Sequence, residues 1–347
     1  MTEQSHIDKV KNYYGHVLAN KNDLKTTACC VGESLPPYLS EIVSKIHNDV
    51  KAKFYGCGVP VPGNLEGLTV LDLGSGSGRD AYLFSALVGE EGKVLGVDMT
   101  QEQLEVAQQY QEFHQKAFGH SSSNVKFTQG YIEDLASADV SDNSVDLVVS
   151  NCVINLSPDK ERVFSEIFRV LKPGGELYFS DVYTDRRLSE ELRTDPVVLG
   201  ECLGGALYVE DFRRILEKVG CSDYRQVSNS VIEVTNPEIK RKTGNANFYS
   251  ITYRAFKLDL EDRCEDYGQV ATYKGSIEEY PNHFALDEHH FFETGRPMLV
   301  CSNTADMLSK TRFKEHFQVT EKKEHFGLFD CGPGAGVTGQ ADSAACC

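Results

Sequence analysis

The sequence lacks three features that would connect it with nucleic acid or with a membrane. It has no excess of basic side chains, because 35 Lys and Arg stand against 52 Asp and Glu, a formal net charge of −17. Without a surplus of positive charge to neutralise phosphates, binding to nucleic acid or to an anionic membrane is not expected. The first residues lack the basic and apolar regions of a signal peptide, and no apolar run approaches the roughly 18 residues of a membrane span. We expect a soluble, cytoplasmic protein, and we take it to be a monomer.

The sequence also lacks the ligand spacing of a zinc site, although it contains 11 cysteines. No C-x-x-C pair and no pair of His residues at ligand spacing is present. A framework of structural disulfides is not expected in a reducing cytosol, so metal, metalloid or redox chemistry is favoured for some of these cysteines. Burial as small apolar residues is the alternative, and it is our prediction for Cys221, Cys264 and Cys301.

A glycine-rich turn follows a short apolar run at residues 70–80 (VLDLGSGSGRD). This order is typical of a buried parallel strand that presents its backbone to a small ligand at the start of a helix. The glycines fall as G-x-G-x-G, which differs from the G-x-G-x-x-G of a dinucleotide site, and no phosphate-binding Lys-Ser/Thr pair follows. The spacing indicates an adenosyl group without a pyrophosphate. A purely structural glycine turn in another α/β protein is the alternative.

From residue 68 onward, strands and helices are predicted to alternate. The expected strands are Thr69–Leu73, Lys93–Val97, Val125–Thr128, Val145–Ser150 and Glu176–Asp181. Helices are expected between them, one of which starts at Thr100 with Gln103 completing a capping box. This alternation is typical of an α/β fold with a mostly parallel sheet and helices on both faces. A polar excursion over residues 183–207 is predicted to form a lid or pocket wall at the carboxyl edge of the sheet.

Four segments are predicted along the chain. Residues 1–60 form a helical, cysteine-bearing segment, in which apolar residues from Leu39 to Val50 recur at helical spacing. Residues 61–235 form the ligand-binding domain. Residues 236–330 form a smaller α+β accessory domain, because aromatic and charged residues, including Phe248–Phe256, replace the βα rhythm. Residues 331–347 form a Gly/Ala/Ser-rich tail that ends in two cysteines and is expected to be disordered.

Five stretches carry a more specific signal: DLGSGSGRD at 72–80, YGCG at 55–58, SNCVINL at 150–156, KPGGEL at 172–177 and GECLGGA at 200–206. Together they resemble the arsenite methyltransferases, a branch of the class I S-adenosylmethionine-dependent methyltransferases. The first and fourth recur in many methyltransferases, whereas the three that contain a cysteine are much more specific. The resemblance covers nearly the whole chain and is loose in the terminal domain and tail. It implies a Rossmann-like methyltransferase domain over 61–235 with an arsenic-binding insertion.

The cofactor implied by this resemblance, S-adenosyl-L-methionine, needs an acid for its ribose, a cradle for its methionine end and a slot for its adenine. Asp98 ends the second strand, where it can accept from the ribose hydroxyls. The glycines would let the backbone approach the methionine moiety. Asp72 is expected to orient the loop or meet the ammonium group, Asn151 to lie near the methionine portion, and Tyr55 to cover the sulfonium. The predicted cofactor residues are Tyr55, Asp72, Gly74, Gly76, Gly78, Asp98, Met99, Ile132, Glu133 and Asn151.

The resemblance also implies a thiol site. Cysteines that match Cys152 and Cys202 hold arsenic in the family, while those that match Cys57 and the Cys29/Cys30 position complete the site and cycle through a disulfide. The adjacent pair leaves two alignments open, and we favour Cys30 over Cys29. Trivalent arsenic carries a lone pair, so it needs soft thiolate ligands and no base.

The implied partners are a trivalent arsenic species, arsenite or a glutathione conjugate, and thioredoxin or glutathione as reductant. Two other hypotheses remain open. The first is a C- or O-methyltransferase of the quinone-pathway type, which shares the cofactor motifs and requires no thiols. The second is a metalloid-binding protein without turnover.

Overall fold

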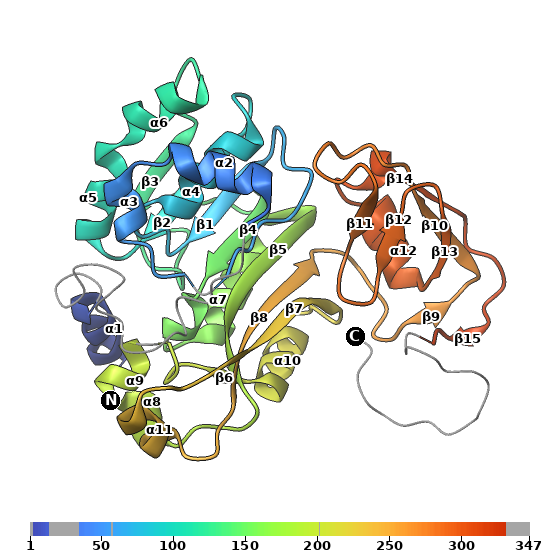
Figure 1. Ribbon diagram of the computed structural model, residues 1–347. Helices are drawn as coiled ribbons and strands as arrows, with labels where there is room; N and C mark the ends of the chain where they lie inside the picture. Colours follow the sequence, from blue (N-terminus) through green and yellow to red (C-terminus); the bar gives the residue numbers. More distant parts are fainter. Residues whose placement is uncertain (1–2, 14–34, 57, 201, 331–347) are drawn as a thin grey trace.

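The computed structural model describes residues 3–13, 35–56, 58–200 and 202–330 (Figure 1). Its largest element is an eight-stranded sheet in the order β3-β2-β1-β4-β5-β8-β7, with β6 paired to the end of β5. The strands are β1 (Thr69–Leu73), β2 (Lys93–Asp98), β3 (Val125–Gln129), β4 (Val145–Asn151), β5 (Leu171–Thr184), β6 (Leu207–Tyr208), β7 (Tyr224–Ile232) and β8 (Phe248–Phe256). Strands β1 to β6 pair in parallel, and β8 is antiparallel to both β5 and β7. The expected mostly parallel sheet is confirmed.

Helices cover both faces of this sheet, because successive residues of its central strands are apolar on each side. Val70 of β1 and Leu147 of β4 pack into one buried cluster, while their neighbours Leu71 and Val148 pack into another. The first cluster is completed by α2 (Pro37–Lys45), α3 (Asn48–Ala52), α4 (Arg79–Val88), α5 (Gln101–Gln109) and α6 (Gln111–Phe118). The second is completed by α7 (Lys160–Val170) and α10 (Val209–Lys218), on the opposite side in Figure 1.

Two local predictions are wrong. The single helix expected from Leu39 to Val50 is broken into α2 and α3, because Ile46 has an extended backbone (φ −75°, ψ 139°) and the side chain of His47 caps α3. The capping box at Thr100 is also not formed, since its side chain makes no capping bond to α5. The backbone N–H of Thr100 donates instead to Asp98 Oδ1 at 2.7 Å, which joins the end of β2 to the start of α5.

The segment Phe248–Phe256, which the sequence analysis assigned to the accessory domain, is the β8 strand of the main sheet. It pairs with β5 on one side and with β7 on the other, and nearly all its residues are buried. A strand that is buried on both faces reads as a continuous apolar or aromatic run without alternation. The aromatic composition near residue 248 therefore marks an interior strand, and the main sheet continues beyond the expected boundary at 236.

The chain beyond β8 forms a small α+β lobe to the right of the sheet in Figure 1. Its elements are β9 (Glu265–Asp266), β10 (Gln269–Tyr273), β11 (His283–Ala285), β12 (Phe291–Glu293), β13 (Pro297–Val300), α12 (Ser302–Ser309), β14 (Phe317–Val319) and β15 (Gly327–Leu328). The lobe has its own buried cluster, which includes Phe284, Phe292 and Phe313. Glu176 of β5 is fully buried and pairs with Arg254 of β8 and with Arg312 of the lobe, so paired charges join the lobe to the sheet.

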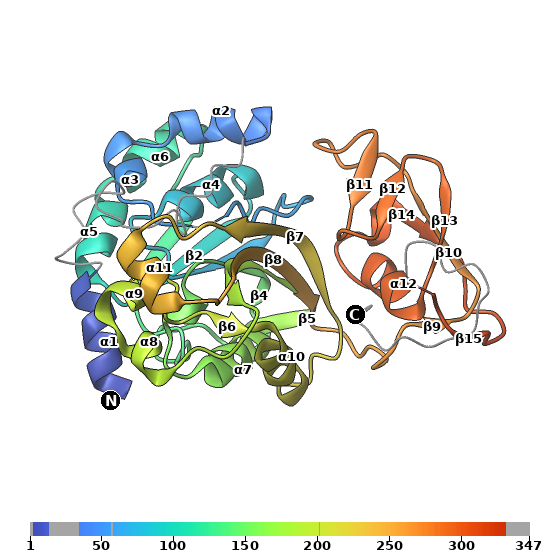
Figure 2. The same cartoon turned by 60° about the horizontal axis from the view of Figure 1, so that its bottom comes forward.

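The polar excursion after β5 lies at the carboxyl edge of the sheet, as expected. It contains α8 (Glu190–Thr194) and α9 (Pro196–Gly200) and returns to the sheet as β6. Helix α1 (Glu3–Asn12) lies beside α9 in two views, so the beginning of the chain and this excursion meet at the same edge (Figures 1 and 2).

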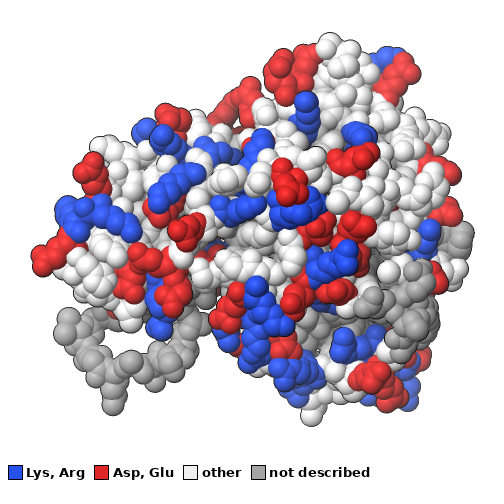
Figure 3. All heavy atoms as spheres, turned by 180° about the vertical axis from the view of Figure 1, so that it is seen from behind, with Lys and Arg blue, Asp and Glu red and all other residues white. Residues whose placement is uncertain are grey.

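The surface carries both signs of charge in close proximity. Over the face seen in Figure 3, Lys and Arg side chains are interspersed with Asp and Glu side chains. Several of the surface charges form ion pairs, such as Arg187 with Asp211 and Lys218 with Glu161. In the part of the chain that the structure describes, no helix is both long enough and apolar enough to span a membrane.

Candidate functional site

A pocket lies at the carboxyl ends of β1, β2 and β4. Its lining includes nine of the ten predicted cofactor residues: Tyr55, Asp72, Gly74, Gly76, Asp98, Met99, Ile132, Glu133 and Asn151. Gly78 is outside this lining. It caps α4 with φ of 87°, and a Cβ there would lie 2.8 Å from the ring of Phe127, so it is required for helix packing. The predicted segments therefore do meet at one pocket, and the role of Gly78 in cofactor binding stays a prediction.

The glycine-rich loop has two different close approaches. Gly74 has φ of 67°, and a Cβ there would lie 2.4 Å from Val153, which follows the end of β4. Gly76 has φ of 50°, and apart from its own chain neighbours no atom of the described residues lies within 4 Å of where its Cβ would be. Its N–H donates to Asp98 Oδ2 at 2.9 Å. The loop is therefore pinned to β2 and to the β4 loop, while the space above Gly76 is open to a ligand.

Acidic side chains give this pocket a character that suits a cation. Asp72 is buried, and its Oδ2 has no hydrogen-bond partner among the described residues. Burial, together with the charges of Asp80 and Asp98, raises the pKa of Asp72 well above its usual value. Burial also raises the pKa of Asp98, against the opposing effect of the N–H groups of Thr100 and Gly76. A ligand with an ammonium or sulfonium charge would relieve this repulsion, so the residues present fit S-adenosylmethionine.

The expected adenine side of the pocket is formed after β3. Ile132 is buried there, and Glu133 accepts a hydrogen bond from the hydroxyl of Ser157. Two residues of α1, Ile7 and Val10, also line the pocket, and Val10 is buried. Neither residue could be predicted from the sequence, because nothing in residues 3–13 indicates which part of the fold that helix covers.

Arg79 and Asp80 belong to the glycine motif, but the sequence predicts no role for them; in the structure both line the pocket and are buried. Arg79 pairs with Asp80, and its guanidinium lies 4.4 Å from the centre of the Phe54 ring. Asp80 Oδ2 accepts from Asn151 Nδ2 at 2.9 Å. The first turn of α4 is therefore connected to the segment around Cys57 and to the end of β4.

The structure brings two of the predicted arsenic ligands together. Cys152 follows β4 and lines the pocket, and the thiol of Cys202 donates to the backbone carbonyl of Cys152 across 3.6 Å. Both residues are buried and both have left-handed backbone, with φ of 60° and 63°. Such strain in non-glycine residues is concentrated at functional sites. Cys152 is disulfide-bonded.

The other predicted ligands, Cys29, Cys30 and Cys57, lie outside the described residues. Within the described part of the chain, no three His, Cys, Asp or Glu side chains are grouped as metal ligands. Cys221, Cys264 and Cys301 are buried, which confirms that prediction, and burial raises the pKa of the Cys221 thiol to about 12. A thiol held protonated in this way is a poor metalloid ligand.

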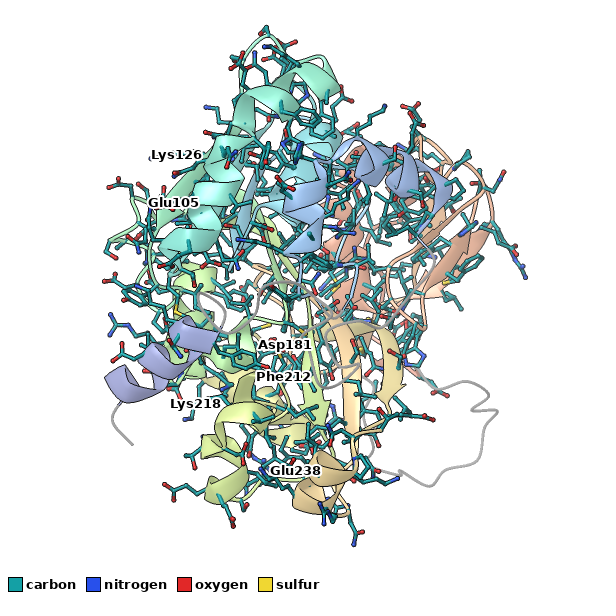
Figure 4. The ribbon with its side chains drawn as sticks, turned by 60° about the vertical axis from the view of Figure 1, so that its left-hand side comes forward. Glu105, Lys126, Asp181, Phe212, Lys218 and Glu238 are labelled. Atoms are coloured by element: carbon teal, nitrogen blue, oxygen red, sulfur yellow. The ribbon has the colours of Figure 1, made fainter. Side chains whose placement is uncertain are left out.

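A close backbone contact seats the excursion against the Cys152 loop. A Cβ on Gly205 would lie only 2.0 Å from the backbone oxygen of Asn155. Asn155 is itself held by Asp181 at the end of β5, to which it donates its backbone N–H at 3.0 Å and its amide at 2.8 Å. Figure 4 shows Asp181 in the interior, and burial raises its pKa to about 6. The segment around Gly205 is therefore positioned through Asn155 from the core of the sheet.

Comparison with known proteins adds two kinds of finding. Residues 64–220 match the family model "Methyltransferase domain", and residues 266–334 match "Arsenite methyltransferase C-terminal domain". An arsenite methyltransferase of Aquipseudomonas alcaligenes is 54% identical over 346 residues, which cover 98% of this chain and 99% of that protein. The human arsenite methyltransferase is 43% identical over 314 residues, 89% of this chain and 82% of its own length.

Among solved structures, an arsenic(III) S-adenosylmethionine methyltransferase from Chlamydomonas reinhardtii superposes with a TM-score of 0.82. The two sequences are 51% identical, and the match covers 86% of this chain and 100% of the Chlamydomonas chain. A demethylmenaquinone methyltransferase of Lactococcus lactis subsp. lactis is 36% identical, but only over 115 residues, or 33% of this chain.

Proposed function

The chain belongs to the arsenite methyltransferases, and we propose that it transfers the methyl group of S-adenosylmethionine to trivalent arsenic held by Cys152, Cys202 and a third thiol. One observation carries this proposal. Cys152 lines the pocket that fits the cofactor, and the thiol of Cys202 touches the Cys152 backbone from the inserted segment. Methyl donor and soft ligands would thus meet at one sheet edge.

In this reaction the bound cofactor supplies an activated methyl group on a sulfonium. The chain's own residues bind and orient the reactants. Asp72 and Asp98 favour a cation in the pocket, and Gly76 leaves room for it. Thiolates at Cys152 and Cys202 would hold arsenic so that its lone pair faces the methyl carbon. Proximity of this kind is worth an effective concentration on the order of 10⁵ M or more, and no general base is required.

The electron balance calls for a reductant. Arsenic uses its lone pair to form the bond to carbon while the bond from carbon to the sulfonium sulfur breaks, so arsenic is formally oxidised by two electrons. Two site cysteines return these electrons and become a disulfide, which thioredoxin or glutathione reduces by thiol exchange. The family resemblance points to Cys57 with Cys29 or Cys30 as this pair. Cys152 is itself disulfide-bonded, so it is a further candidate for this exchange.

The two other hypotheses are less well supported. A quinone-pathway methyltransferase accounts for only a third of the chain in the comparison above, and it leaves the terminal lobe and the cysteine-bearing segments unexplained. A binding protein without turnover would not need the open, acidic pocket beside Cys152.

The test is the speciation of arsenic after incubation of the purified protein with arsenite, S-adenosylmethionine and a thiol reductant. We expect methylated arsenicals that depend on all three additions, with faster formation when thioredoxin and its reductase replace a monothiol. Unchanged arsenite beside bound arsenic would overturn catalysis in favour of sequestration. Methylation that proceeds to completion without any reductant would overturn the disulfide cycle alone.

A further inference from the structure

We propose that the side chain of Asn151 is a positioning group for the thiol loop, defined by Phe54, Gly56 and Gly58 on either side of Cys57, and is not a ligand of the cofactor. The inference rests on the proposed function and takes Cys57 as its third arsenic-binding thiol. It replaces the role near the methionine portion that the sequence suggested for Asn151.

The carboxamide of Asn151 joins both backbone groups of one residue. Its Oδ1 accepts from the N–H of Gly58 at 3.1 Å, and its Nδ2 donates to the carbonyl of Gly58 at 2.9 Å. Nδ2 also donates to Asp80 Oδ2 at 2.9 Å. The reversed amide would place its oxygen against two acceptors, so these partners fix the orientation. Because both N–H bonds of the amide go to protein oxygens, a cofactor carboxylate could be bound only by breaking one of them.

The same network reaches the other end of the loop. Asp80 pairs with Arg79, whose guanidinium covers the ring of Phe54. Arg79 and Asp80 are each only 8% exposed, so their pairing and hydrogen bonds are needed to keep two charges buried. Gly58 and Phe54 are thus held from the first turn of α4, immediately after the glycine-rich loop that lines the pocket.

The glycines beside Cys57 fit this clamp. A Cβ on Gly56 would lie 2.5 Å from Asn151 Nδ2, and a Cβ on Gly58 would lie 2.6 Å from Ser180 Oγ. Neither residue could carry a side chain without displacing the amide or the sheet. Cys152 follows Asn151 directly in the chain, and its backbone N–H donates a hydrogen bond to the backbone carbonyl of the same Ser180 at 2.9 Å. Asn151 therefore ties Gly58 to the end of β4, directly before Cys152.

The variant Asn151→Ala tests the proposal on the full-length enzyme, with Asn124→Ala as a matched control. Asn124 also donates its amide to two backbone carbonyls, those of Ser85 and Gly89, but it is not part of the pocket lining. Four quantities are measured: hydrogen exchange in the peptide that contains Gly58, the Kd for S-adenosylmethionine, the Kd for phenylarsine oxide, and the KM of each substrate.

For Asn151→Ala we expect faster exchange at Gly58 and about tenfold weaker binding of phenylarsine oxide, the size of effect of two lost hydrogen bonds. The KM for arsenite should rise, while the Kd and KM for S-adenosylmethionine stay within about twofold. In a Cys57→Ser background, Asn151→Ala should weaken arsenical binding no further, because the thiol that it positions is absent. Asn124→Ala should change none of these.

A loss of cofactor affinity with unchanged exchange at Gly58 would overturn the proposal and return Asn151 to the cofactor site. Additive effects of Asn151→Ala and Cys57→Ser would also overturn it. Failure of the proposed function looks different, since Cys57→Ser alone would then leave arsenical binding and turnover unaffected. The exchange measurement needs no arsenic, so it tests the clamp in either case.

Discussion

The thiol of Cys202 reaches the backbone carbonyl of Cys152 across 3.6 Å, although 50 residues separate them in the chain. The contact places an inserted segment against the end of β4, beside the pocket. If both sulfurs hold arsenic, Cys152→Ser and Cys202→Ser should each reduce methyl transfer by about a hundredfold or more, as expected for a displaced reactant. Cofactor affinity should remain. Turnover is measured by product speciation and affinity by calorimetry, with Cys221→Ser as a buried cysteine outside the pocket. Full turnover by either variant would refute the assignment.

The left-handed backbone at Cys202 predicts an unusual order of stabilities. An L-residue in this region is strained by about 1–2 kcal/mol, and glycine is not. Cys202→Gly should therefore have a higher free energy of unfolding than Cys202→Ala, by about 1 kcal/mol in chemical denaturation. At Cys221, whose φ is not positive, the order should reverse because glycine adds flexibility to the unfolded chain. Equal stabilities at position 202 would mean that the strain is relaxed in solution.

Substitutions at two glycines should affect the cofactor site and the arsenic site independently. Gly205→Ala forces a methyl group against the backbone of Asn155, so the inserted segment should no longer seat and arsenical binding should weaken. Gly76→Ala meets no atom among the described residues beyond its chain neighbours but projects into the pocket at φ of 50°, so cofactor affinity should fall about tenfold or more.

Both variants are titrated with phenylarsine oxide and with S-adenosylmethionine. Gly205→Ala should weaken binding of the first ligand only, and Gly76→Ala binding of the second only. Loss of both ligands in both variants would indicate general unfolding, which circular dichroism would reveal.

The local rhythm of the sheet and its cofactor edge could be predicted from sequence, because β1 to β5 each carry their own apolar run and turn. Other features depend on partners that are distant in sequence. β8 looked like an accessory segment because burial on both faces removes the alternation that marks an ordinary strand. Arg79 and Asp80 acquire a role only through Phe54 and Asn151, and the glycine pair around Cys57 only through Asn151 and Ser180. No pattern within any of these segments encodes such pairings.

The raised pKa of Asp72 predicts that cofactor binding is linked to protons. A cation favours the charged carboxylate, so binding should release a proton when Asp72 is protonated in the free enzyme. Affinity for S-adenosylmethionine should therefore rise with pH, by up to about tenfold per unit below the raised pKa. Calorimetry in two buffers of different ionisation enthalpy measures the proton released. Asp72→Asn should bind more weakly and lose the dependence, and a flat profile in the unmodified enzyme would contradict the prediction.

Asp181 should make the free energy of unfolding depend on pH. Burial raises its pKa to about 6, whereas an unfolded chain has an aspartate pKa near 3.9, so the folded state binds this proton more tightly. Stability then falls as pH rises wherever the native state holds more protons. Between about pH 4 and 6, this one group should lower the free energy of unfolding by about 1–3 kcal/mol. Asp181→Asn should remove this pH dependence of the free energy of unfolding. The variant should also be less stable overall, because a carboxamide has only one oxygen and cannot accept all the hydrogen bonds that the carboxylate accepts from the N–H groups of Asn155 and Val182. The free energy of unfolding of both proteins is measured by urea titration from pH 4 to 7. If it changes with pH by the same amount in both, Asp181 stays charged throughout.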